Sequence, residues 1–183
     1  MPDPIFAPVF APVFDGHNDL LSRLWDAGDS AGRGFFDGRA GDISLDHCRA
    51  GGMAGGFFAI WVPGEAADAP DPRAMYRAFP PISVEKAHRV TLEQAAILIR
   101  MAAARPDAIR LCRTVAEIEA ARAAGAIAAI LHLEGCEGIG AGLDELQVLH
   151  AAGLRSLGPV WSRDNIFGHG VPFNFPASPD TGP

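Results

Sequence analysis

Residues 126–135 read Ala-Ile-Ala-Ala-Ile-Leu-His-Leu-Glu-Gly, and this stretch does the most to decide the fold. Its first eight residues are almost all apolar, and a continuous apolar run of this length predicts a buried β-strand. Glu134 follows the run directly and precedes Gly135, so we expect its carboxylate at the rim of the core. A helix cap or a solvated turn is the alternative role for Glu134. The direction of His132, inside the run, stays open.

Further apolar runs alternate with helical patterns on both sides of this strand. The runs predict strands at residues 11–14, 57–62, 109–112 and 154–161, and the run at 57–62 is typical of a strand buried on both faces. Helical patterns cover residues 45–49, 83–105, 114–124 and 143–152. Thr114 and Glu117 have the spacing of a capping box. This alternation predicts an α/β protein with parallel strands, whose functional residues lie at the C-terminal edge of the sheet.

A second polar motif, Phe14-Asp15-Gly16-His17-Asn18-Asp19, follows the first apolar run. In an extended segment, residues two apart point to the same side, so His17 and Asp19 are expected to converge. Imidazole and carboxylate groups are good ligands for zinc and similar divalent ions. The motif therefore predicts half of a metal site. The alternative is a polar turn in which Asp15 or Asp19 caps the next helix.

The composition excludes several classes of protein. The 183 residues are 49% apolar, enough for one substantial core, and the net charge of −7 argues against nucleic acid or an anionic membrane as a partner. The three cysteines, Cys48, Cys112 and Cys136, form no C-x-x-C pair, which favours a reducing compartment and a cytoplasmic location. We see no signal peptide and no membrane segment, since no run approaches roughly 20 apolar residues.

The two polar motifs together resemble those of the membrane (renal) dipeptidase family of zinc peptidases. The His17-Asn18-Asp19 motif resembles the family's first metal-binding motif, Glu134-Gly135 its central Glu-Gly motif, and residues 149–157 the helix-to-strand segment that follows. The resemblance runs from about residue 13 to the end. It implies a (β/α)8 barrel with two zinc ions, in which His17 and Asp19 bind one ion and Glu134 bridges both. A hydroxide between the metals then attacks the peptide carbonyl of a dipeptide; other divalent metals are compatible with these ligands.

The chain departs from the family pattern in two places. Trp161 stands where the family often has a histidine that contacts the reacting carbonyl, and we expect Trp161, Arg163 and His169 near the substrate. The family's two further metal-binding histidines come from C-terminal strands for which the sequence shows no counterpart. We therefore expect a tail at residues 1–12 and, at 13–183, the N-terminal half of the barrel, inactive by itself.

Two other functions remain open. One is a different barrel metallohydrolase, such as an amidohydrolase or a phosphoesterase, although those enzymes usually begin with His-x-His. The other is a truncated domain without catalytic activity. Half a barrel leaves edge strands near Val13 and Leu157 that favour pairing with another chain, so a homodimer is a possible assembly.

Overall fold

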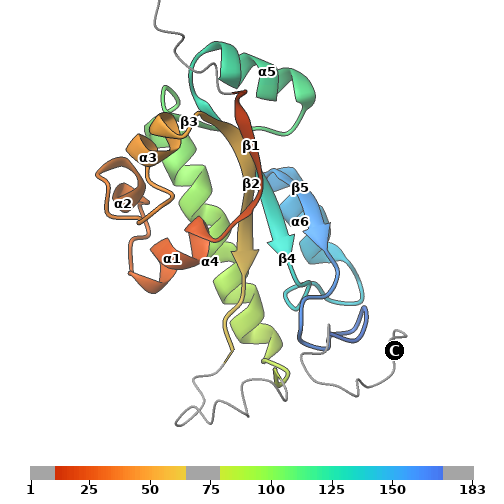
Figure 1. Ribbon diagram of the computed structural model, residues 1–183. Helices are drawn as coiled ribbons and strands as arrows, with labels where there is room; N and C mark the ends of the chain where they lie inside the picture. The colour runs from red at the N-terminus through yellow and green to blue at the C-terminus, as the bar shows by residue number, and fades with distance from the viewer. Residues whose placement is uncertain (1–10, 65–78, 171–183) are drawn as a thin grey trace, which may run out of the picture.

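The computed structural model describes residues 11–64 and 79–170, which form a parallel sheet covered by helices (Figure 1). The strands are β1 (Val13–Asn18), β2 (Met53–Trp61), β3 (Ile109–Leu111), β4 (Ile127–Glu134) and β5 (Leu154–Gly158). The order is β1-β2-β4, and both β3 and β5 then pair with β4. Because β3 pairs with the first half of β4 and β5 with the second half, the two share one edge of β4.

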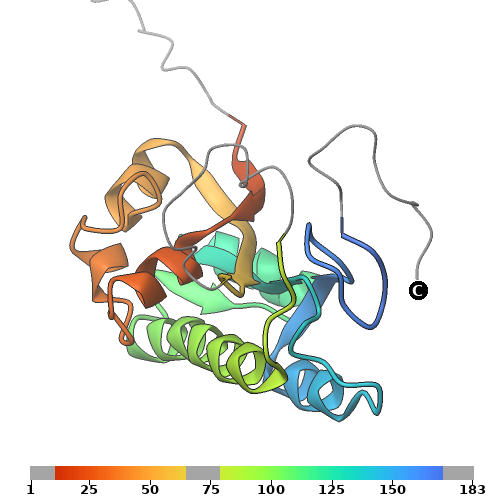
Figure 2. The same cartoon turned by 90° about the horizontal axis from the view of Figure 1, so that it is seen from below.

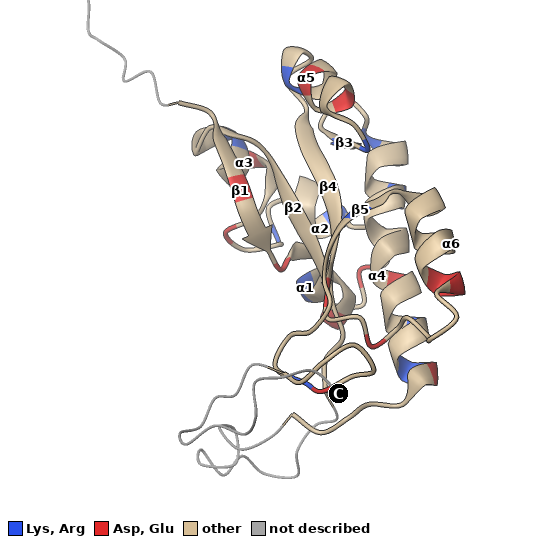
Figure 3. Cartoon of the chain, turned by 90° about the vertical axis from the view of Figure 1, so that its right-hand side faces the viewer, with Lys and Arg blue, Asp and Glu red and all other residues tan. Residues whose placement is uncertain are grey.

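Six helices connect the described strands. They are α1 (Leu20–Asp26), α2 (Arg33–Phe36), α3 (Leu45–Ala50), α4 (Val84–Ala104), α5 (Val115–Ala123) and α6 (Asp144–Ala152). Figures 2 and 3 show α4 and α6 side by side against one face of the sheet. The helix α5 lies at the end of the sheet where β4 begins (Figure 1). The α/β fold with parallel strands that the sequence predicts is thus confirmed.

The hydrophobic core lies between the sheet and these helices. Leu131 and Leu133 of β4 are completely buried there, together with Phe58 and Ile60 of β2. On the other face of β4, Ile130, His132 and Glu134 are only half-buried, as is Phe57 on β2. The expectation that the strand at 57–62 is buried on both faces therefore holds for one face and only partly for the other.

Several predicted boundaries need correction. The strand expected at residues 154–161 ends at Gly158, so Trp161 lies in the loop that follows. The short helix α2 lies between α1 and α3, where no helical pattern was recognised. The capping box is confirmed, since the Thr114 hydroxyl accepts a hydrogen bond from the backbone N–H of Glu117. Most of the tail expected at 1–12 lies outside the described residues.

Within the described residues, none of the helices combines the length and the apolar character that a membrane crossing requires.

Candidate metal centre

The strand β1 continues to Asn18, past the expected end at residue 14, so His17 lies within the strand and Asp19 directly follows it. The Asp15 carboxylate accepts hydrogen bonds from the backbone N–H of His17, at 3.2 Å, and from the Asn18 side chain, at 3.0 Å. The Asn18 oxygen in turn accepts the N–H of Leu20 at the start of α1. Asp19 is the N-cap residue of α1, yet its side chain makes no capping hydrogen bond. The Asp19 carboxylate is thus left for another role, and the alternative in which it caps the helix does not hold.

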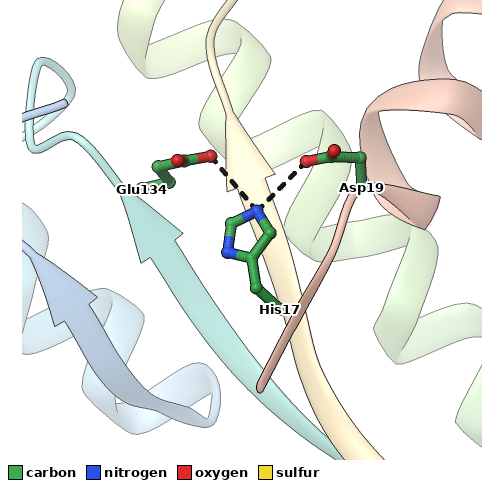
Figure 4. Close-up of side chains that lie close together, drawn as sticks. All are labelled: His17, Asp19 and Glu134. Carbon is green, nitrogen blue, oxygen red and sulfur yellow. Dashed lines mark hydrogen bonds and ion pairs between the residues drawn. The ribbon is translucent and has the colours of Figure 1, made fainter. Parts of the chain in front are cut away.

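Three side chains converge at the C-terminal edge of the sheet. The Nε2 atom of His17 lies 3.2 Å from Asp19 Oδ1 and 3.4 Å from Glu134 Oε2. Figure 4 shows the imidazole between the two carboxylates. One ligand atom from each residue lies within 4.8 Å of the other two. The predicted convergence of His17, Asp19 and Glu134 is therefore found in the structure, and we call these residues the His17–Asp19–Glu134 cluster.

The backbone after β4 turns sharply at Gly135. Its φ of 82° lies in the left-handed region, which glycine adopts without strain. A Cβ atom at this position would also collide with the carboxylate of Glu137, which folds back over the glycine. Gly135 thus lets β4 end at Glu134, which leaves the Glu134 carboxylate at the edge of the sheet.

The surroundings of Glu134 are unfavourable for a lone negative charge. Burial raises its pKa, and the negative charges of Asp19 and Glu137 raise it further, while His17 lowers it. A divalent cation among the three donors would offset this desolvation and this repulsion. One imidazole and two carboxylates also form a donor set that zinc, manganese and cobalt accept. The cluster therefore fits a divalent metal ion.

The other three predicted site residues, Trp161, Arg163 and His169, contact residues outside the His17–Asp19–Glu134 cluster. The indole of Trp161 packs edge-to-face on Trp61, with ring centroids 5.2 Å apart. Trp61 is the partner of Glu134 in the β2–β4 register, so Trp161 is held near the same edge of the sheet. Arg163 is buried, and its guanidinium donates to Glu137 at 3.0 Å. His169 is partly exposed and pairs with Asp164 at 3.2 Å.

Two residues near the cluster, His132 and Glu137, were not recognised from the sequence. The ring of His132 packs edge-to-face on His17, with centroids 5.8 Å apart. A signal for it existed, because His132 lies two residues before Glu134 and therefore on the same face of the strand. The buried pair of Glu137 with Arg163 had no comparable signal, since its two members come from loops after different strands.

Parallel strands that bring a histidine, an aspartate and a glutamate to their C-terminal edge define an α/β protein with a cluster of potential metal ligands at that edge. The sequence comparison then identifies the family. The profile of the membrane dipeptidase family, peptidase family M19, matches residues 9–177, and the chain belongs to this family. The resemblance noted from the motifs is thus confirmed.

Curated relatives are longer than this chain. An uncharacterized protein of Acinetobacter calcoaceticus, from the PQQ-III 3′ region, is 35% identical over 179 residues, which cover 96% of this chain and 56% of the relative. An uncharacterized protein of Klebsiella pneumoniae, from the pqqA 5′ region, is 44% identical over 91 residues, or 50% of this chain and 34% of the relative. The chain spans about half the length of the first of these relatives.

Solved structures show the same fold. A metallopeptidase of family M19, dipeptidase AC, is 46% identical with a TM-score of 0.79, and the match covers 93% of this chain and 49% of that one. A metallopeptidase from Rhodobacter sphaeroides, liganded with a phosphinate mimic of the dipeptide L-Ala-D-Ala, is 46% identical with a TM-score of 0.81, covering 93% and 51%. A probable dipeptidase from Pseudomonas aeruginosa, 21% identical with a TM-score of 0.69, shares the fold over 93% of this chain and 40% of its own. The expectation of about half of the family's fold is confirmed.

Proposed function

We propose that this chain is part of a metal-dependent dipeptidase in which His17, Asp19 and Glu134 hold a divalent cation. The convergence of their ligand atoms within 4.8 Å carries the proposal. Membership of the dipeptidase family supports it, as does a 46% identical relative that binds a dipeptide mimic. The substrate class we propose is accordingly a dipeptide.

The ion we propose is zinc, with two ions in the longer protein and Glu134 shared between them. A bound divalent cation supplies Lewis acidity, which polarises a carbonyl and activates water near neutral pH. The protein's own part is to fix the ligands: the hydrogen bonds of the Asp15 carboxylate hold the end of β1 around His17, and Gly135 lets β4 end with Glu134 at the sheet edge. The burial that raises the pKa of Glu134 makes its lone negative charge unfavourable, and a bound cation would offset this cost.

Substrate contacts are proposed for the loop after β5. The indoles of Trp161 and Trp61 form an apolar wall beside the register position of Glu134, which suits the side chain of a small dipeptide. His169 is accessible for a polar contact. Arg163 can reach a substrate only by leaving its buried pair with Glu137, so its role in binding stays a prediction that the geometry does not favour.

For the 183 residues alone, a second candidate is a metal-binding domain with little or no dipeptidase activity. The observation that favours it is that the chain spans about half the length of its relatives, while His17, Asp19 and Glu134 offer ligands for one ion. Among the described strands, β1 pairs with β2 alone and β5 with β4 alone. These free edges support a homodimer. The three buried thiols support a reducing, cytoplasmic location.

A chelator experiment tests the proposed function. Hydrolysis of a dipeptide panel is measured for a longer protein that contains this chain, before and after metal removal, and again with zinc restored. We expect activity to disappear with the metal and to return with zinc. Activity that persists without metal contradicts the proposal, and cleavage of other amide substrates but no dipeptides points to an amidohydrolase-like enzyme. The 183-residue chain, assayed in parallel, is expected to hydrolyse little.

A further inference from the structure

The imidazole of His17 has to reach across a strand to meet Glu134. The strand β1 pairs with β2, and β2 lies between β1 and β4; Figure 4 shows β2 passing behind the ring. The β2 residue in register with His132 is Ala59. Ala59 shares a face of β2 with the half-buried Phe57, yet it is completely buried. Neighbouring side chains therefore cover the Ala59 methyl group, and its small size leaves room for them.

Within the described residues, no hydrogen bond to the second ring nitrogen of His17, Nδ1, fixes the orientation of the imidazole. Its Nε2 atom faces Asp19 and Glu134, whereas Nδ1 has no hydrogen-bond partner in the part of the chain that the structure describes. Metal-binding histidines usually donate their second ring N–H to a carboxylate, a carbonyl or water. Here the ring of His132 contacts His17 instead, edge-to-face at an interplanar angle of 78°.

The ring of His132 is itself fixed from two directions. Its Nδ1 atom lies 2.8 Å from the hydroxyl of Ser156, the residue directly opposite on β5. Its face also packs against Phe57 of β2, with centroids 6.2 Å apart at an angle of 83°. Contacts from the two neighbouring strands, β2 and β5, thus fix the position of the His132 ring. Through its own contact, the His132 ring can in turn restrict the orientation of the His17 ring, which is attached to β1.

We propose that His132 is a positioning residue, which holds the imidazole of His17 in its metal-binding orientation through ring packing. This inference rests on the metal centre proposed above. His132 acts through His17, because it is not among the three residues whose ligand atoms converge. Ser156 supports it from β5, and Ala59 provides the space in which the two rings meet.

The test measures metal binding. The zinc affinity of the 183-residue chain is determined by competition with a chromophoric chelator, and the visible spectrum of bound cobalt reports the ligand geometry. We expect His132→Ala to weaken zinc binding about tenfold and to alter the cobalt spectrum, the lower end of the range for residues that orient metal ligands. His132→Phe keeps a ring in place and should remain close to the unsubstituted chain. His150→Ala, at an exposed position on α6, is the matched control and should change nothing.

Each other result overturns the inference. If His132→Phe loses as much affinity as His132→Ala, then His132 binds the ion itself. If both variants bind like the unsubstituted chain, the ring contact has no role. If the unsubstituted chain binds no zinc, the metal centre fails and this inference with it. Should His132→Ala not fold, Ser156→Ala replaces it: this change frees the His132 ring and should weaken binding severalfold, and unchanged affinity with an unchanged spectrum contradicts the proposal.

Discussion

The two faces of the sheet differ along the same strand. On β4, Leu131 and Leu133 point to the helices and are completely buried, whereas His132 and Glu134 lie on the opposite face and are half-buried. The helix-covered face is a continuous hydrophobic core, and the other face carries the imidazole and the carboxylate of the candidate metal centre. Between residues 131 and 134 of β4, the odd-numbered side chains therefore belong to the core and the even-numbered side chains to the candidate metal centre and its surroundings. This follows because successive side chains of a strand point to opposite faces of the sheet.

The buried pair of Arg163 and Glu137 lies in the loops beyond the C-terminal ends of the strands, and its loss should have the largest effect. Arg163 also donates to the carbonyl of Val62, so it connects the loops that follow β2, β4 and β5. Because Arg163→Met leaves a carboxylate buried without a partner, we expect it to lower the free energy of unfolding by about 4 kcal/mol in urea denaturation. The double variant Arg163→Met/Glu137→Gln should recover most of this loss. A stable single variant with weakened dipeptide binding would instead support a role in substrate recognition.

Truncating a side chain to alanine should lower the free energy of unfolding more on the helix-covered face of β4 than on the opposite face. Leu133→Ala removes a completely buried side chain from the core and should lower the free energy of unfolding by about 3 kcal/mol. Ile130→Ala, on the half-buried face of the same strand, should cost about 1 kcal/mol, because less apolar surface is lost from burial. Both values come from urea denaturation of the metal-free chain. Equal losses would show that the second face is as well packed as the first.

Glu134→Gln should separate metal binding from folding. The substitution removes a negatively charged ligand from the His17–Asp19–Glu134 cluster while preserving its shape. We expect zinc affinity to fall about a hundredfold, which corresponds to about 2.7 kcal/mol. The free energy of unfolding without metal should not fall. Glu119→Gln, at an exposed position on α5, is a matched control of the same chemistry and should leave zinc affinity unchanged. Undiminished binding by Glu134→Gln would remove Glu134 from the ligand set.

The smallest effect concerns Cys136, which lies two residues after Glu134 but in the hydrophobic core. Burial raises the pKa of its thiol to about 11, above its ordinary value of 9.0. The unfolded thiol ionises first, so this contribution to stability is complete below pH 9 and is lost as the pH rises towards 11. Cys136→Ala should therefore reduce the slope of stability against pH between 9 and 11. The slopes of the two proteins are compared, rather than their absolute stabilities, because the substitution also creates a cavity. Parallel slopes would show that this thiol does not titrate differently on folding.

Local patterns predicted the features of this chain that depend on neighbouring residues. The apolar run before Glu134 and the i, i+2 spacing of His17 and Asp19 were sufficient to place three side chains at one edge. The spacing of His132 from Glu134 places the two on one face of β4. The contact of His132 with His17 depends in addition on β2 lying between their strands and on the small Ala59, which no pattern within one strand shows. The same holds for Arg163, which was expected near the substrate although its partner is the internal carboxylate of Glu137.

The position of His17 and Glu134 on non-adjacent strands has a consequence for folding kinetics. The two residues lie far apart in the sequence, and their contact requires β1, β2 and β4 to be paired in the correct register. Contacts of such long range form late, because the entropy of closing the intervening chain must be overcome first. The ability to bind a metal ion should therefore appear only after the three strands have assembled, and its time course would report the completion of the sheet.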